Sequence, residues 1–199
     1  MTHFQPTMSA WKEYLDNATL NALPTDFSRL NEGKVVDSRI AVPISQETDV
    51  ALTALASNYN TTPYAVGLAL FMVMVGRHSG DEDVVVGSCL ESDKQHCVTR
   101  CQSVNKSVTF ANLLDAVNSS FKVARSSPAV HSDVRTLFGG EDKFRCLFLE
   151  GPTSTLTHFS YKDMALIYSP SENQFVCHYN SLIFKRQRIQ FFIDEFFQL

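Results

Sequence analysis

The chain has 199 residues, 44% of them hydrophobic and 19% charged, which is typical of a soluble globular protein with a sizeable core. The 21 acidic residues outnumber the 17 basic ones, giving a net charge of −4, and no basic stripe with interleaved aromatic residues occurs. These features exclude the usual footprint of a nucleic-acid-binding protein. The longest apolar run, Tyr64–Val75, falls short of the roughly 20 residues that a membrane span needs, so it predicts a buried helix.

Cysteine usage and the N-terminal residues bear on the cellular compartment. The five cysteines are an odd number without a Cys-x-x-Cys pair, which indicates neither a disulfide framework nor a zinc ribbon. We expect reduced thiols in a cytoplasmic protein. Residues 1–15 lack the basic segment and apolar stretch of a secretory signal.

The first half of the chain predicts three helices, an arm and a strand. In chain order these are a short helix at 11–15, an extended arm at 21–30, a strand at 35–42, and helices at 45–58 and 62–78. Ser45 and Thr62 are the expected N-caps, with Pro63 at the first position of the second long helix. Gly80 is placed to end that helix, as a C-terminal glycine does.

The second half is richer in strands. The expected elements are strands at 83–88 and 97–104, a helix at 109–125, a helical turn at 131–138, strands at 143–150, 156–161, 165–169 and 175–180, and a last helix. The basic cluster 185–188 opens this last helix, where a solvated face is expected. The helix has the cleanest apolar periodicity in the chain, carried by Ile189, Phe192, Ile193, Phe196 and Phe197. The pattern predicts one α+β domain, residues 1–199, with helices packed on a mixed sheet.

Several histidines and cysteines are weak candidates for chemistry. His131 and Asp133 are two residues apart, and such residues do not face each other on a helix, so a capping residue beside a surface histidine is expected. His158 and His178 lie in predicted strands, where we expect them to be packed or hydrogen-bonded. A metal site at His96, Cys97 and Cys101 lacks a matching second cluster.

The acidic loop Asp81–Asp83 does not fit a calcium site, because its acidic residues are consecutive whereas an EF-hand alternates its ligands. The sequence also contains no phosphate-binding P-loop, no GxGxxG after a strand, no GxSxG and no HExxH. From the residues alone, the chain is an α+β domain without a visible active site.

The stretch at 69–88, ALFMVMVGRHSGDEDVVVGS, resembles the condensation domains of nonribosomal peptide synthetases. In that family a buried helix ends in an Arg-x-x-Gly-acidic loop and leads into a strand that ends in glycine. The matching positions are Arg77, Gly80, Asp81, Asp83, Val85, Val86 and Gly87. The resemblance implies a structural corner in which Gly80 allows the turn and the acidic residues hold the loop in solvent.

Four further blocks resemble the family in the same order, at 11–30, 108–137, 143–151 and 179–184. They imply the second lobe of a chloramphenicol-acetyltransferase-like fold, with a helix and arm at 1–33 and a core at 34–199. The first lobe carries the family's catalytic His-His-x-x-x-Asp-Gly motif. This chain has no adjacent histidines, and its segment between Gly87 and Val104 is shorter than in the family. We therefore expect no catalytic, cofactor-binding or metal-binding residues in it.

Within that superfamily, the blocks at 14–27, 144–151 and 179–184 are similar to the fungal L-2-aminoadipate reductases of lysine biosynthesis. The similarity implies a multidomain parent that adenylates 2-aminoadipate with ATP and Mg²⁺, loads it on phosphopantetheine and reduces it with NADPH to the semialdehyde. Because the last predicted helix has no capping signal before Leu199, we expect the chain to be a piece of such a protein.

The expected partners are the adenylation domain that follows and the carrier domain, with no nucleic acid and no membrane. Two alternatives stay open at this point. One is a degenerate acyltransferase or condensation enzyme that uses His131 or His158 as base. The other is a lobe that self-associates to replace its missing half.

Overall fold

The computed structural model describes residues 8–16, 18, 20–30, 34–89, 97–102, 104, 109–126, 144–154 and 162–199, without the side chains of residues 8–11, 97 and 123–126. In chain order the elements are α1 (Met8–Asp16), β1 (Asp37–Pro43), α2 (Gln46–Asn58), α3 (Pro63–Ser79), β2 (Val84–Cys89), β3 (Cys97–Cys101), α4 (Phe110–Ser126), β4 (Cys146–Glu150), β5 (Met164–Ser169), β6 (Gln174–Asn180) and α6 (Arg186–Gln198).

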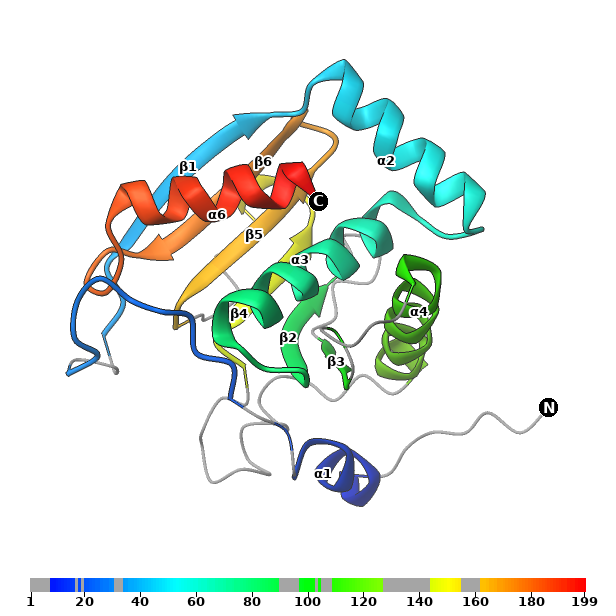
Figure 1. Ribbon diagram of the computed structural model, residues 1–199, viewed down its shortest axis with the longest axis horizontal. Helices are drawn as coiled ribbons and strands as arrows, with labels where there is room; N and C mark the ends of the chain where they lie inside the picture. Colours follow the sequence, from blue (N-terminus) through cyan, green and yellow to red (C-terminus); the bar gives the residue numbers. More distant parts are fainter. Residues whose placement is uncertain are drawn as a thin grey trace.

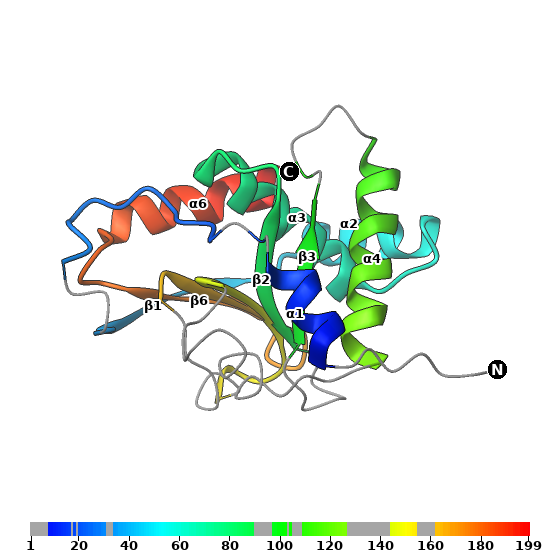
Figure 2. The ribbon, with the colours of Figure 1, turned by 90° about the horizontal axis from the view of Figure 1, so that it is seen from below.

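Six strands form one mixed sheet in the order β1-β6-β5-β4-β2-β3. The β2–β4 and β4–β5 pairs are parallel, and the other three pairs are antiparallel. Helices α3 and α6 lie against one face of the sheet, and α4 stands beside β3 at its far edge (Figures 1 and 2). The α+β architecture expected from the sequence is confirmed.

The helix termini follow the local signals in the sequence. The Ser45 hydroxyl accepts a hydrogen bond from the Thr48 amide at 3.0 Å, and the Thr62 hydroxyl accepts one from the Ala65 amide at 3.2 Å. Gly80 ends α3 with φ of 79°, a left-handed conformation that glycine adopts without strain. These caps fix the two helices that lead into the acidic corner.

Aromatic side chains form the centre of the core between α3, α6 and the sheet. The Phe148 ring of β4 lies 5.3 Å from the Tyr64 ring, 5.4 Å from the Phe71 ring and 6.4 Å from the Phe196 ring, centroid to centroid. Gly67 lets α3 approach this ring, because a Cβ there would lie 2.8 Å from Phe148 Cζ. The apolar run at 64–75 is thus a buried helix, as expected.

Two strands differ in detail from the expectation. The strand predicted at 143–150 begins only at Cys146, and it is buried from Cys146 to Leu149. Such a continuous buried run is typical of a strand with a parallel neighbour on each side. Strand β1 begins at Asp37, two residues later than expected, and leaves Val35 and Val36 exposed before it. The turn predicted at 131–138 and the strand predicted at 156–161 lie outside the described residues. Within the described part of the chain, no helix has the length and apolar character to cross a membrane.

Candidate functional site

The acidic corner between α3 and β2 anchors the N-terminal arm. Asn21, which is 2% exposed, donates through Nδ2 to Asp81 Oδ2 and to the Asp83 carbonyl oxygen, both at 2.8 Å. Its Oδ1 accepts from the Val85 amide at 2.7 Å. The expectation that the acidic residues only hold the loop in solvent is therefore wrong for Asp81. The side-chain amide needs these fixed acceptors because it is buried.

Asp83 holds a second contact, to the edge strand β3. Its carboxylate accepts from Arg100 Nε at 2.9 and 3.1 Å and from Arg100 Nη2 at 2.6 Å. Arg100 is 7% exposed, and the hydrogen bonds that it donates to Asp83 raise its pKa. This bidentate geometry is the strongest form of an arginine–carboxylate pair. Asp83, like Asp81, has a structural partner rather than a purely solvated role.

The outer backbone groups of β3 are satisfied by helices α1 and α4. The Arg100 amide donates to the Ser120 hydroxyl at 3.2 Å, and the Tyr14 hydroxyl donates to the Arg100 carbonyl at 3.1 Å. Arg100 Nη1 also donates to the Tyr14 carbonyl. Burial raises the pKa of the Tyr14 hydroxyl, which stays a neutral donor. These contacts protect an edge strand that would otherwise present unpaired groups.

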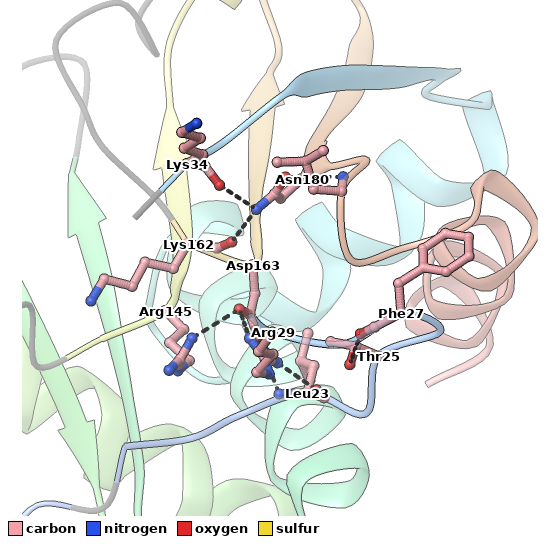
Figure 3. A network of polar contacts seen from close by, with 10 residues as sticks. Leu23, Thr25, Phe27, Arg29, Lys34, Arg145, Lys162, Asp163 and Asn180 are labelled. Atoms are coloured by element: carbon pink, nitrogen blue, oxygen red, sulfur yellow. Dashed lines mark hydrogen bonds and ion pairs between the residues drawn. The ribbon is translucent and has the colours of Figure 1, made fainter. Parts of the chain in front are cut away.

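A buried carboxylate joins the arm to the start of β5 (Figure 3). Asp163 is fully buried and accepts from Arg29 Nη1 at 2.7 Å, Arg29 Nη2 at 2.8 Å and the Leu23 amide at 3.2 Å. Arg145 Nη1 lies 3.5 Å from the same carboxylate, and Arg29 Nη2 also donates to the Leu23 carbonyl at 2.7 Å. Two guanidinium groups thus compensate one buried charge and hold the arm in place.

Asn180 at the end of β6 makes a second junction. Its Oδ1 accepts from the Val36 amide at 3.2 Å, and its Nδ2 donates to the Lys34 carbonyl at 3.1 Å and the Lys162 carbonyl at 3.4 Å. The asparagine therefore ties together the entries to β1 and β5. This explains a physical role for the Tyr-Asn block noted in the sequence.

The basic cluster at 185–188 opens α6 as expected, and part of it is engaged by the arm. The Asp26 carboxylate accepts from the Lys185 amide and from Arg188 Nε, each at 2.9 Å. Burial acts to raise the pKa of Asp26, but these hydrogen bonds outweigh it and lower the pKa. Arg186 Nη1 donates to the Arg39 carbonyl at 3.2 Å. The prediction that residues 185–188 form a solvated face is therefore only partly correct.

Of the histidine candidates, the structure describes His178. Its Nδ1 lies 2.9 Å from Asp37 Oδ1, which confirms the expected hydrogen-bonded placement in a strand. Among the described residues, its buried Nε2 has no hydrogen-bond partner. His131, Asp133, His158 and His96 lie outside the described residues.

Four cysteines lie in the described part of the core. Cys89, Cys101, Cys146 and Cys177 are buried and unbridged. Burial raises the pKa of the Cys146 and Cys177 thiols, which keeps them protonated and unreactive. Among the residues that the structure describes, no three histidine, cysteine or acidic side chains gather into a possible metal site.

Three residues of these junctions were not singled out from the sequence: Asn21, Arg29 and Asp163. The sequence signal for these contacts was weak. It consisted of polar residues inside the arm, and of polar residues directly before or at the end of apolar strands. The carboxylates of Asp26, Asp83 and Asp163 each accept more than one N–H group and are oriented by them. This arrangement suits a scaffold that fixes the arm, rather than proton transfer.

Comparisons with known proteins find relatives of this chain by sequence and by fold. The family model described as Condensation domain matches residues 2–95. The chain is 25% identical to the L-2-aminoadipate reductase of Schizosaccharomyces pombe over 177 residues, which are 86% of this chain and 12% of that protein. It is 26% identical to the L-2-aminoadipate reductase of Saccharomyces cerevisiae over 196 residues, which are 94% of this chain and 14% of that protein.

The solved condensation domain from Monacolin K polyketide synthase MokA has a TM-score of 0.74 and 14% identity, and the match covers 96% of this chain and 55% of that chain. The chain therefore has the fold of one part of a condensation domain. Its expected resemblance to condensation domains and to L-2-aminoadipate reductases is confirmed. The chain spans only 12–14% of the length of these curated relatives.

Proposed function

We propose that this chain is a condensation-like lobe without catalytic activity of its own, and that it docks the adenylation domain of a large aminoadipate-reductase-like polypeptide. One observation carries the proposal. The chain aligns over 86% and 94% of its length with two reductases, yet by fold it corresponds to about half of a solved condensation domain. On this proposal, the adenylation domain would pack against the lobe and cover apolar surface on it.

The sequence supports the absence of condensation chemistry. The family motif needs two adjacent histidines, and the six histidines of this chain are all separated. The described carboxylates of Asp83 and Asp163 are held in ion pairs with arginine side chains. These pairs give both carboxylates a structural partner within the fold.

For the parent protein we propose the reaction that the relatives' name indicates. It would adenylate 2-aminoadipate with ATP and Mg²⁺, carry the product on phosphopantetheine and reduce it with NADPH. The 199 residues contain no motif for any of these groups, and the described ones show no metal-ligand cluster. We therefore assign no step of that reaction to this chain, which would act in a cytoplasmic enzyme as a structural module.

The alternative function is a degenerate acyltransferase that uses His131 or His158 as base. It predicts measurable acyl transfer from a pantetheine thioester, with loss of that transfer in His131→Ala or His158→Ala. Our proposal predicts transfer no faster than the buffer reaction and no effect of either substitution.

Docking is tested by titrating the 199-residue chain against the separately expressed region that follows it in its native polypeptide. Binding measured by calorimetry, together with the absence of transfer, is the expected result. A chain that remains alone at all concentrations, or that transfers acyl groups through either histidine, would overturn the proposal. Sedimentation of the chain by itself over a wide concentration range tests self-association, for which we expect a monomer.

A further inference from the structure

One end of the molecule collects basic side chains around the turn that joins β6 to α6. Among the described residues, eight basic and three acidic side chains gather there: Arg29, Lys34, Arg39, Arg145, Lys162, Lys185, Arg186 and Arg188, with Asp26, Asp37 and Asp163. Their net charge of +5, eight minus three, contrasts with the net charge of −4 for the whole chain. We call this region the basic end.

Hydrogen bonds show that the basic end is one continuous region. Asn180, at the start of the turn, bonds the carbonyls of Lys34 and Lys162. Ile183, in the turn, accepts through its carbonyl from the amides of Asp26 and Phe27. Figure 3 shows the Lys34 and Lys162 side chains on one side of Asn180 and the Phe27 ring on the other.

Three of the basic side chains already have carboxylate partners. Arg29 and Arg145 share the Asp163 carboxylate, and Arg188 pairs with Asp26. The other five are Lys34, Arg39, Lys162, Lys185 and Arg186, and none of them forms an ion pair with a carboxylate in the described part of the chain. Within the described residues, no carboxylate competes for their charge.

Apolar side chains lie among these cations. Phe27 is 45% exposed, Leu30 89%, Val35 41% and Val36 50%. The Lys185 ammonium lies 5.6 Å from the centroid of the Phe27 ring. Single exposed apolar residues are ordinary, but several beside one turn favour an interaction surface. The turn contacts two of these apolar residues through the backbone. The Ser181 hydroxyl donates to the Val36 carbonyl, and the Ile183 carbonyl accepts from the Phe27 amide.

We propose that the basic end binds an acidic polypeptide segment that carries apolar side chains. This inference rests on the docking role proposed above, and it adds the surface and the chemistry of the partner. Acidic side chains of the segment pair with Lys34, Lys185 and Arg186, and its apolar side chains cover Phe27 and Leu30. A polypeptide fits better than a nucleic acid, which offers no apolar side chains to cover these residues. It also fits better than an anionic membrane, because the chain as a whole is acidic and is repelled by an extended negative surface.

The test measures binding of fluorescent 12-residue peptides to the 199-residue chain by anisotropy. One peptide repeats Glu-Glu-Leu, and the other repeats Glu-Glu-Ser with the same charge. We expect the leucine peptide to bind at least fivefold more tightly than the serine peptide. Phosphatidylserine vesicles and a DNA duplex serve as the competing anionic probes, and both should bind more weakly.

Variants locate the surface. Lys34→Glu with Lys185→Glu should weaken binding of the leucine peptide by about tenfold or more, since each substitution removes an ion pair and adds a repulsive charge. The matched control is Lys12→Glu with Lys122→Glu, which makes the same change in net charge on exposed positions of α1 and α4 and should change binding less than twofold. Leu30→Ser should lower affinity for the leucine peptide alone. Unchanged melting temperatures show that each variant is folded.

Three results would overturn the inference: no binding of the leucine peptide, equal losses in the control variant, or tighter binding of vesicles or DNA. The proposed function fails on a different observation, namely a native protein that is no larger than 22.3 kDa. Peptide binding at the basic end would remain measurable in that case.

Discussion

Replacing Asp163 with asparagine tests the junction between the arm and the sheet. The side chain is fully buried. Its two oxygens accept hydrogen bonds from both Arg29 Nη atoms, from Arg145 Nη1 and from the Leu23 amide. An asparagine of nearly the same shape removes the negative charge. It also turns an NH₂ group toward one of these donors, wherever the amide is oriented.

The cost follows from the two guanidinium groups left behind. Removing one partner of a buried ion pair lowers the free energy of unfolding by about 3–5 kcal/mol, because the remaining charge stays buried without compensation. That is a large part of the roughly 5–15 kcal/mol by which a domain is stable. With a urea m-value of about 2 kcal/mol/M, the unfolding midpoint of Asp163→Asn should fall by about 1.5–2.5 M.

Urea unfolding followed by circular dichroism measures the effect, with Asp115→Asn on the exposed face of α4 as control. The control should stay within about 0.5 kcal/mol of the parent chain. In the double variant Asp163→Asn with Arg29→Gln, the loss should be smaller than the sum of the two single losses by about 2 kcal/mol, because the two residues share one interaction. A loss below about 1 kcal/mol for Asp163→Asn, or additive effects in the cycle, would refute the reasoning.

Three further predictions concern the arm and the sheet. Asn21→Ala should destabilise the chain by about 2–3 kcal/mol in urea unfolding, because it leaves the buried Val85 amide without its acceptor, whereas exposed Asn112→Ala should be nearly neutral. Because the pKa of Asp26 is lowered in the folded chain, its contribution is present above its unfolded pKa and is lost as pH falls through the folded value. The stability difference between the parent chain and Asp26→Asn should therefore shrink as pH falls from about 5 to about 2, and a constant difference would contradict this pairing. Gly87→Ala should cost about 1–3 kcal/mol by thermal unfolding, because its Cβ would lie 2.3 Å from a neighbouring leucine side-chain atom, and a neutral result would show that the sheet relaxes there.

The sequence predicted the features that depend on neighbouring residues. Ser45, Thr62 and Gly80 act through atoms within a few positions along the chain, so capping rules located both helices correctly. The apolar periodicity of the last helix placed Ile189, Phe192, Ile193 and Phe196 on its buried face. Local patterns were sufficient for the α+β class.

The long-range contacts could not be read from the sequence. Asn21 meets Asp81 across 60 positions, and Asp163 meets Arg29 across 134. Which acidic residue is solvated and which is paired depends on the path of the arm, and no local pattern specifies that path. The parallel pairing of β4 between β2 and β5 is likewise set by the fold.

The central claim is that this chain is one module of a much larger reductase-like protein. An antibody raised against the chain, used to blot an extract of cells that express the native gene, tests it most directly. The account predicts a single band several times heavier than 22.3 kDa that also carries a phosphopantetheine label. A band at 22.3 kDa without that label would contradict the account and favour a free-standing lobe.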